Sequence, residues 1–174
     1  TVAAQIGAVN TIVKTQNSAL KGYNTDIYGF GMSIKPFFES HHERALIFGY
    51  GGAAKAIHYV LKQLGVSCVF VVRDLNKIND APANMISYDD LGAEGIKHFK
   101  LLVNTTPVGT YPNIDDCLPI PFEGISEKHL CYDLIYNPEK TMFLKNAAAR
   151  GAKTINGLNM LKLQAEKSWT IWNA

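Results

Sequence analysis

Short apolar segments alternate with helix-forming segments along most of this chain, and this alternation constrains the fold more than any other feature. The apolar segments are expected to be strands, at residues 45–48, 67–72, 85–88, 101–103, 130–135 and 153–155. Apolar residues at helical spacing predict helices over 52–64, 139–150 and 157–169. Continuously apolar strands separated by crossover helices are typical of a parallel sheet that is buried on both faces. The sequence therefore predicts an α/β protein with a doubly wound parallel sheet.

The first of these predicted strands ends in a glycine-rich turn that fits the pattern GxGxxA, Gly49-Tyr50-Gly51-Gly52-Ala53-Ala54. In such a turn the first glycine permits the sharp bend, the second lets the backbone approach a pyrophosphate, and the alanine allows close helix packing. The helix that follows offers free N–H groups to phosphates. We expect a Rossmann-like site in which the cofactor contacts Gly49, Gly51, Gly52 and Ala53. The alternative is an ordinary glycine-rich turn without a ligand.

The residues after the second predicted strand bear on which dinucleotide binds. Arg73 and Asp74 follow this strand directly, and Lys77 comes four residues after Arg73. An acidic residue here would bind a ribose 2′-hydroxyl and favour NAD, whereas an arginine would pair with a 2′-phosphate and favour NADP. The two positive charges, Arg73 and Lys77, lead us to expect NADP. The alternative is that Arg73 is a solvated turn residue.

The first 40 residues do not follow the alternating pattern. They predict two strands, at 9–13 and 19–23, and a helix over 25–38 that breaks near Pro36. A polar hinge is expected at 40–43. We therefore interpret residues 1–40 as the remnant of a first domain with its hinge and residues 41–174 as a complete second domain. Because the chain starts at Thr1 within sequence that looks structured, we expect it to be truncated at its N-terminus.

Pattern alone gives ordinary structural roles to Asp26, Met160 and Gln164. Asp26 follows Asn24 and Thr25, which can cap a helix, and in the first turn its carboxylate complements the helix dipole. Met160 and Gln164 lie four residues apart on one face of the last helix. On helical spacing alone, Met160 is a core residue and Gln164 a surface residue.

The composition excludes several classes of partner. The net charge of +2 is small and no run of basic residues is present, which argues against nucleic acid. The apolar stretches are too short to cross a bilayer. Three cysteines without paired spacing, Cys68, Cys117 and Cys131, favour a reducing compartment. We therefore expect a cytoplasmic protein with a small-molecule substrate, no metal, and no nucleic-acid or membrane partner.

Six short motifs, in one order across nearly the whole chain, resemble those of the shikimate dehydrogenase family (shikimate and quinate dehydrogenases). They are Gly7-Ala8-Val9-Asn10-Thr11, Gly22-Tyr23-Asn24-Thr25-Asp26, the turn at 49–54, Asn104-Thr105-Thr106-Pro107-Val108-Gly109, Asp133-Leu134-Ile135-Tyr136-Asn137-Pro138, and Gly157-Leu158-Asn159-Met160-Leu161 with Gln164. This family reduces 3-dehydroshikimate to shikimate with NADPH, on the route to the aromatic amino acids. Its N-terminal domain binds the substrate, and its C-terminal domain binds the cofactor.

The resemblance implies roles for individual residues. Asp26 matches the family's catalytic aspartate, and substrate contacts are implied for Asn10, Asp26, Tyr136 and Gln164. Cofactor contacts are implied for Thr105, Thr106, Gly157 and Met160. Arg73 matches the arginine of the family's Asn-Arg-Thr/Ser motif, although its neighbours Val72 and Asp74 depart from that motif. The C-terminal helix is expected to return toward the substrate cleft.

The resemblance also implies that part of the active site is absent from this chain. The catalytic lysine of the family, and the serines that bind the substrate carboxylate, precede Thr1 in the family's order. We therefore expect an NADP-dependent dehydrogenase whose fragment is nearly inactive alone. Two alternatives stay open: a dehydrogenase of quinate or a related hydroxy acid, and a nucleotide-binding module without catalysis.

Overall fold

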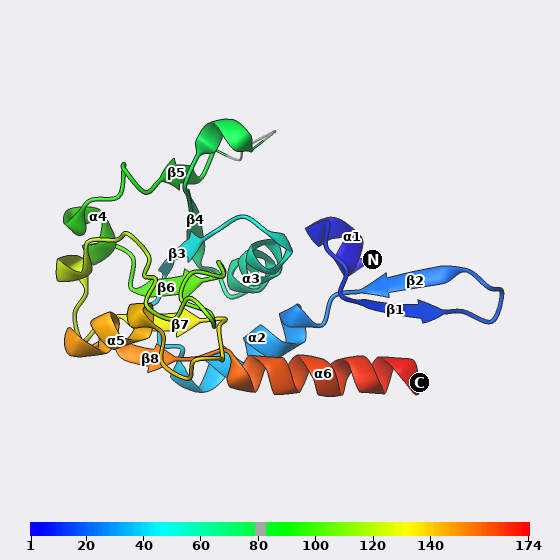
Figure 1. The fold of residues 1–174 in the computed structure, drawn as a ribbon. Helices are drawn as coiled ribbons and strands as arrows, with labels where there is room; N and C mark the ends of the chain where they lie inside the picture. The colour runs from blue at the N-terminus through cyan, green and yellow to red at the C-terminus, as the bar shows by residue number, and fades with distance from the viewer. Residues whose placement is uncertain (79–82) are drawn as a thin grey trace.

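A six-stranded parallel sheet forms the centre of the molecule (Figure 1). The computed structural model describes residues 1–78 and 83–174. The strands lie in the order β5-β4-β3-β6-β7-β8. Their bounds are β3 (Arg44–Phe48), β4 (Ser67–Val72), β5 (Met85–Ser87), β6 (Leu101–Asn104), β7 (Leu130–Asp133) and β8 (Lys153–Ile155). The chain builds outward from β3 to β5, then returns to β6 beside β3 and builds outward to β8. The doubly wound α/β prediction is confirmed.

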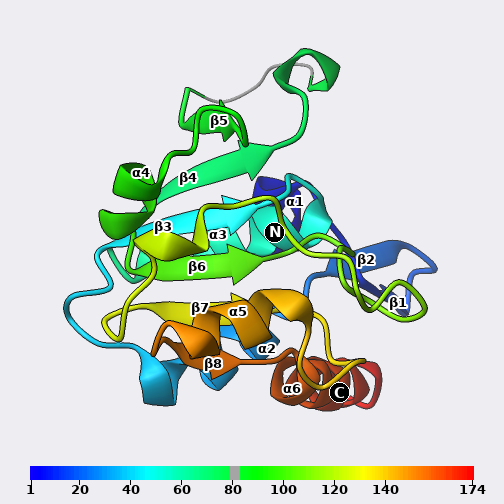
Figure 2. The same ribbon diagram turned by 60° about the vertical axis from the view of Figure 1, so that its left-hand side comes forward.

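Helices cover the two faces of the sheet and enclose two separate cores (Figure 2). On one face, α3 (Gly52–Gln63) connects β3 to β4, and its Ile57 and Leu61 are fully buried against the sheet. The opposite face is covered by α4 (Ala93–Lys97) and α5 (Met142–Ala149), with Ile96 and Phe143 buried there. Short 3-10 turns, η2 (Leu75–Lys77) and η3 (Phe122–Gly124), complete the connections. Burial on both faces explains why the strands are continuously apolar.

The helix α2 (Asp26–Ile34) packs on the same face of the sheet as α3. Its Phe30 and Ile34 are fully buried in that core, and the Phe30 ring meets the Tyr132 ring edge-on at 5.0 Å. Ser33 Oγ lies 2.7 Å from the Tyr132 hydroxyl. After α2 the chain passes through η1 (Lys35–Phe37) into β3. Thus α2, although it belongs to residues 1–40, shares a core with the sheet of residues 41–174.

A β-hairpin extends away from the sheet, as Figure 1 shows. It is formed by β1 (Thr11–Lys14) and β2 (Leu20–Tyr23), which pair antiparallel, and it follows the short helix α1 (Val2–Ile6). The last helix, α6 (Leu158–Trp172), runs from the sheet to this hairpin. There the Trp172 indole N–H donates to the Ile12 carbonyl at 3.1 Å. The C-terminal end of α6 is thus bonded to the hairpin.

Local signals account for the differences from the predicted elements. The helix expected over 139–150 begins only at Met142, because the Thr141 side chain caps it by accepting the Leu144 N–H at 3.3 Å. The five-residue helices α1 and α4 were not predicted, since such short segments show no periodicity. No helix among the described residues has the length and apolar character needed to cross a membrane.

Candidate functional site

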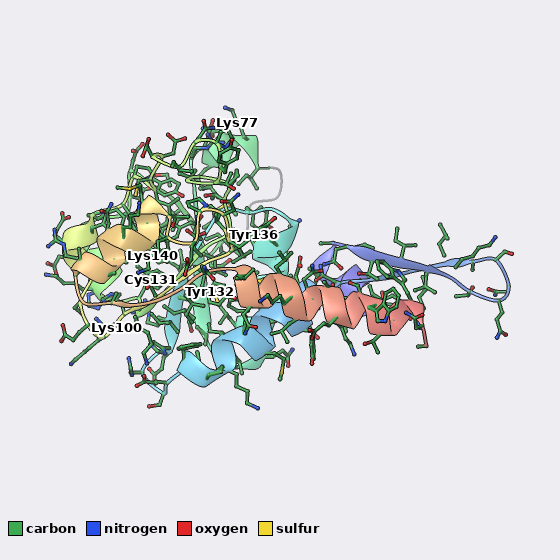
Figure 3. All side chains as sticks on the ribbon, turned by 60° about the horizontal axis from the view of Figure 1, so that its bottom comes forward. Lys77, Lys100, Cys131, Tyr132, Tyr136 and Lys140 are labelled. Carbon is green, nitrogen blue, oxygen red and sulfur yellow. The ribbon has the colours of Figure 1, made fainter. Side chains whose placement is uncertain are left out.

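A cavity of about 470 Å³ opens at the carboxyl edge of the sheet, where β6 and β7 end. One wall comes from the loop after β6, and the opposite wall comes from the loop after β7. The cavity is lined by Thr105, Thr106, Pro107, Thr110, Tyr111, Leu134, Ile135, Tyr136 and Asn137. Figure 3 labels Tyr132, in the buried strand, and Tyr136, in the loop that follows it. Three predicted site residues, Thr105, Thr106 and Tyr136, therefore share this cavity.

The glycine-rich turn lies beside the first wall of the cavity. Gly49 has a φ of +101°, and a side chain there would come within 2.9 Å of Thr105 Oγ1, so only glycine fits. Thr105 is in turn tied to β3, because its N–H and its hydroxyl both donate to the Phe48 carbonyl, at 3.0 and 2.6 Å. Gly51 precedes the first turn of α3, and a Cβ on it would meet no atom within 4 Å.

The start of α3 therefore offers an open surface of backbone N–H groups. No side chain caps this helix, and Gly52 and Ala53 form its first turn. Unpaired N–H groups and the positive end of the helix dipole are suited to phosphate oxygens. A Cβ at Gly51 would meet no atom, whereas one at Gly52 would lie 3.2 Å from the Ala8 side chain, so the approach to these N–H groups is open at Gly51.

The charged residues after β4 are arranged differently from the simple pair that the sequence suggested. Arg73 is exposed, and its positive charge lowers the pKa of Tyr88, which burial raises to about 12. Lys77 Nζ lies 3.5 Å from Asp74 Oδ2, and Asp74 Oδ1 accepts the Asn76 N–H at 3.0 Å. Asp74 is thus occupied within its own turn. The Lys77 side chain is 82% exposed, so this ion pair holds it only weakly.

A buried polar network lies beneath the cavity. Asn104 and Asp133, the last residues of β6 and β7, are opposite each other in the strand register. Asn104 Nδ2 donates to Asp133 Oδ1 at 3.0 Å, and the Thr141 hydroxyl donates to Asp133 Oδ2 at 2.6 Å. Burial raises the pKa of Asp133 to about 6, and the hydrogen bonds from Thr141, Ile135 and Asn104 act against that rise. Sequence reasoning gave these residues no role, although polar residues ending apolar strands were a usable signal.

Asp26 belongs to a second polar network, at the N-terminal end of α2. Its Oδ1 accepts a hydrogen bond from Asn10 Nδ2 at 3.0 Å, and Asn24 Oδ1 accepts the Asp26 N–H at 3.1 Å. Burial raises the pKa of the Asp26 carboxyl, and the bond from Asn10 lowers it. The carboxylate is therefore held by a side chain from the segment before the hairpin, in addition to its position in the first helical turn.

Hydroxyl groups connect this second network to α6. The Thr25 hydroxyl lies 3.1 Å from Gln164 Oε1 and 3.0 Å from Ser168 Oγ, and Thr11 Oγ1 lies 2.8 Å from Ser168 Oγ. Asn10 Oδ1 accepts from the Thr25 N–H at 2.9 Å. Thr11, Thr25 and Ser168 are all buried. The sequence predicted only a capping role for Thr25, whose side chain makes no cap bond to α2, and it gave Thr11 and Ser168 no role. Thr25 and Ser168 lie 143 positions apart, so no local pattern connects them.

The two networks are joined by α6. Its cap residue Gly157 donates its N–H to the Ile135 carbonyl at 3.0 Å, and a Cβ there would lie 1.9 Å from the Leu134 carbonyl oxygen. Seven residues later, about 10 Å along the helix, Gln164 reaches Thr25. Between them, Met160 is buried against α2, whose Gly29 would bring a Cβ to 2.7 Å from the Met160 carbonyl oxygen.

A second cavity, of about 480 Å³, lies along α3 and β4. Its lining includes Tyr50, Lys55, His58 and Phe70, and none of the predicted site residues. In the described ranges 1–78 and 83–174, no group of three His, Cys, Asp or Glu side chains could hold a metal ion. The cavity between β6 and β7 is therefore the better candidate site.

Comparison with known proteins gives relatives of one family. A shikimate dehydrogenase (NADP⁺) from Caldanaerobacter subterraneus subsp. tengcongensis is 41% identical over 181 residues, which covers 98% of this chain and 64% of that protein. The solved shikimate 5-dehydrogenase of Thermus thermophilus, in complex with NADP(H) and shikimate, matches with a TM-score of 0.81 and 32% identity. That match covers 98% of this chain and 64% of the other. Over nearly its whole length, the chain is therefore similar to part of these shikimate dehydrogenases.

The homology extends over the whole arrangement of networks and cavity, but the chain spans less than two thirds of these shikimate dehydrogenases. Quinate dehydrogenase from Corynebacterium glutamicum, solved in complex with NAD, matches with a TM-score of 0.77 and 27% identity. Its coverage is 98% of this chain and 64% of its own. No family model matches the chain. The fold is thus shared by relatives whose structures contain different dinucleotides.

Proposed function

We propose that this chain binds NADP(H) and forms the cofactor-binding part of a shikimate dehydrogenase, which reduces 3-dehydroshikimate to shikimate. The observation that carries this proposal is α6, which starts on the cavity wall at Ile135 and carries Gln164 to the Asp26 network. A cofactor site and a carboxylate held by polar side chains are thereby connected through one rigid helix. A module that only senses a nucleotide would have no need of the second network.

The cofactor is assigned to the carboxyl edge of the sheet. The pyrophosphate would lie at the N-terminus of α3, over Gly51, Gly52 and Ala53, with Gly49 shaping the turn. The nicotinamide end would lie toward Thr105 and Thr106, with Gly157 and Met160 at the start of α6. Arg73 is the group proposed for the 2′-phosphate, because Asp74 is occupied by its own turn. Lys77, which Asp74 holds only weakly, adds a second positive charge.

The substrate is assigned to the side of Asp26. When bound, the nicotinamide supplies the hydride chemistry. Asp26 would hold the proton at the substrate oxygen, and its burial favours this task because it brings the pKa closer to neutrality. Asn10 orients the Asp26 carboxylate, while Gln164 and Tyr136 would contact the ring substituents. Residues 1–40 would contribute to the substrate side and 41–174 to the cofactor side, with α2 packed on the latter.

The cofactor assignment is tested by calorimetric titration of this chain with NADPH and NADH at one ionic strength. NADPH is expected to bind more tightly, and Arg73→Ala to remove most of the difference. Lys77→Ala should have a smaller effect, and Asp74→Asn should not weaken NADPH binding. Lys97→Ala, a lysine paired with Glu94, serves as the control. Equal affinity for the two cofactors would contradict the NADP assignment.

The substrate assignment requires the length of the relatives. In a chimera, this chain would replace the segment that it matches in the Caldanaerobacter enzyme. Oxidation of shikimate and of quinate with NADP⁺ is then compared. Faster turnover of shikimate is the expected result, whereas faster turnover of quinate would favour the quinate alternative. Turnover of neither, in a folded chimera that binds NADPH, would support the non-catalytic module.

A further inference from the structure

The two loops that line the cavity are bonded to one buried group. The Asp133 side chain is fully buried at the end of β7, and it accepts hydrogen bonds from three different parts of the chain. Asn104 Nδ2 and the Ile135 N–H donate to its Oδ1, each at 3.0 Å. The Thr141 hydroxyl, at the start of α5, donates to its Oδ2.

The bond from Asn104 extends the network to the first wall of the cavity. Asn104 Oδ1 accepts both the Thr106 N–H, at 2.9 Å, and the Thr106 hydroxyl, at 2.7 Å. Because a backbone N–H can only donate, this contact fixes the orientation of the Asn104 amide, and its Nδ2 must donate toward Asp133. The adjacent Thr105 is bonded to Phe48, directly before the glycine-rich turn.

The bond from Ile135 extends the network to the second wall. Leu134, Ile135 and Tyr136 line that wall, and Gly157, which starts α6, donates to the Ile135 carbonyl. Asp133 itself does not line the cavity. It lies beneath both walls. It is bonded directly to Ile135 of the second wall and, through Asn104, to Thr106 of the first wall.

We propose that Asp133 is the positioning residue of the cofactor site, whose carboxylate holds the Thr105–Thr106 wall and the Ile135–Tyr136 wall in register. The inference rests on the proposed binding of NADP(H), but it concerns residues of this chain alone. The three donors occupy three of the about four lone-pair sites of the ionised carboxylate, two on Oδ1 and one on Oδ2. In the neutral form, the carboxyl proton would face groups that themselves donate. The Asn104 amide N–H and the Ile135 N–H cannot accept it, and only the Thr141 hydroxyl could rotate to do so.

Titration of Asp133 makes the proposal measurable. The pKa of this buried carboxyl is raised to about 6. Cys117, in the loop before η3, is the titratable neighbour that feels its charge: burial chiefly, and the Asp133 carboxylate in addition, raise the pKa of the Cys117 thiol. The network should therefore be tight at pH 8 and loosened at pH 5.

The test compares the wild-type chain with Asp133→Asn, which keeps the shape and one acceptor oxygen but removes the charge. NADPH affinity of the variant is expected to be about tenfold weaker at pH 8, the equivalent of about one hydrogen bond. At pH 5 the ratio of the two affinities should approach one, because the wild-type carboxyl is then also neutral. A 2′-phosphate titrates near pH 6 as well, but its effect is common to both proteins and leaves the ratio unchanged.

Amide hydrogen exchange supplies a measurement that needs no cofactor. In the variant, exchange at Thr106 and Ile135 should be about tenfold faster, while exchange in β4 stays unchanged. If wild-type chain failed to bind NADPH, the cofactor assignment would be lost, and the exchange experiment would still decide the role of Asp133. Unchanged exchange at both amides, or an affinity ratio that is the same at pH 5 and pH 8, would overturn the inference.

Two further variants guard against misleading results. Asp116→Asn, at an exposed aspartate of the loop between β6 and β7, should change neither the affinity nor its pH dependence. Thr141→Val removes one donor to Asp133 without touching the cavity. It should raise the pH at which NADPH affinity and Thr106 protection change. If Asp133→Asn does not fold, this shift is the deciding result, and its absence counts against the proposal.

Discussion

The two polar networks of this molecule are built in different ways. The network of Asn104, Asp133 and Thr141 is fully buried and lies within one sheet and the helix that follows it. The network of Asp26 connects the segment before the hairpin to the middle of α6, and Asp26 itself is only half-buried. The first is fixed by strand register. The second exists only while α2, α6 and the hairpin remain packed, so we expect it to be the easier of the two to disturb.

The largest effect is expected at Asp26 itself. In the chimera described above, Asp26→Asn should lower turnover by about 10²- to 10⁴-fold, the usual contribution of a positioned acid–base group. NADPH affinity and the melting temperature should change little, because the Asp133 network is untouched. If Asp26 only complemented the helix dipole, replacing it with asparagine would change stability little, and turnover would remain near that of the unchanged chimera.

The packed interface between α2 and α6, where Gly29 meets Met160, provides the next test and is called the seam below. A Cβ at Gly29 would lie 2.7 Å from the Met160 carbonyl oxygen, so Gly29→Ala should separate the helices and lower the free energy of unfolding by about 1–3 kcal/mol. Gly31, two residues along α2, is the matched control, because a Cβ there would meet Val60 at an ordinary 3.5 Å. Gly31→Ala should be neutral or stabilising through helix propensity. Thermal unfolding followed by circular dichroism measures both, and equal effects would show that the seam is not tightly packed.

Two buried titratable groups, His42 and Asp133, should change the stability in opposite directions at acid pH. His42 is buried after η1, and its Nδ1 accepts the Glu39 N–H at 2.9 Å. Burial, with the charge of His41, lowers the pKa of His42 to about 4. Only the unfolded chain binds that proton between about pH 6.5 and 4, so His42 reduces stability as the pH falls through this window. Asp133, with its pKa raised to about 6, does the reverse below pH 6 because the folded state takes up its proton first.

Melting temperatures between pH 7.5 and 4.5 test this difference. His42→Asn, whose amide oxygen can replace Nδ1 as acceptor, should flatten the loss of stability on acidification. Asp133→Asn should make the loss steeper, because the compensating proton uptake is gone. The exposed His98→Gln is the control and should follow the wild type. Identical slopes in all four proteins would show that neither buried group governs acid stability.

The smallest effect is expected at Ser168. Its removal leaves Thr11 and Thr25 with Asn10 Oδ1 as an acceptor, at 3.1 and 3.2 Å, so Ser168→Ala should cost only about 0.5–1.5 kcal/mol. Thr170→Ala is the matched control, because both hydroxyls donate to the carbonyl four residues earlier and only Ser168 is buried. Denaturant unfolding of the pair measures the difference. A loss as large as that of Gly29→Ala would mean that the hydroxyls hold the seam more strongly than the packing does.

The sheet was largely predictable from the sequence because each strand is defined by its own residues. The predicted bounds of β4 and β8 match the structure at both ends, and Gly49 has the positive φ that its place in the turn requires. Met160 is buried as helical spacing predicted. Gln164 was a surface residue on spacing alone and became a site residue only through the family resemblance. In the structure it is half-buried and bonded to Thr25.

What could not be predicted depends on which segments meet. Asn104 and Asp133 ended predicted strands, but only the register of β6 against β7 makes them partners. Ser168 has no local signal, since its partners come from the opposite end of the chain. The packing of α2 likewise depends on Phe30 and Ile34 being buried against the same face of the sheet as α3. The sequence of residues 1–40 alone does not show this contact. The roles of the site residues stay predictions that the proposed variants test.

The contact between Trp172 and the hairpin has a practical consequence for spectroscopy. The chain has two tryptophans, Trp169 and Trp172, and both lie near the end of α6, far along the helix from Gly157. Both indoles are more than half exposed, and one is bonded to Ile12. Intrinsic emission excited at the indole band therefore reports on the hairpin end of α6 and not on the sheet. A change in that emission marks an altered contact between Trp172 and the hairpin, and unfolding of the sheet has to be followed by another probe.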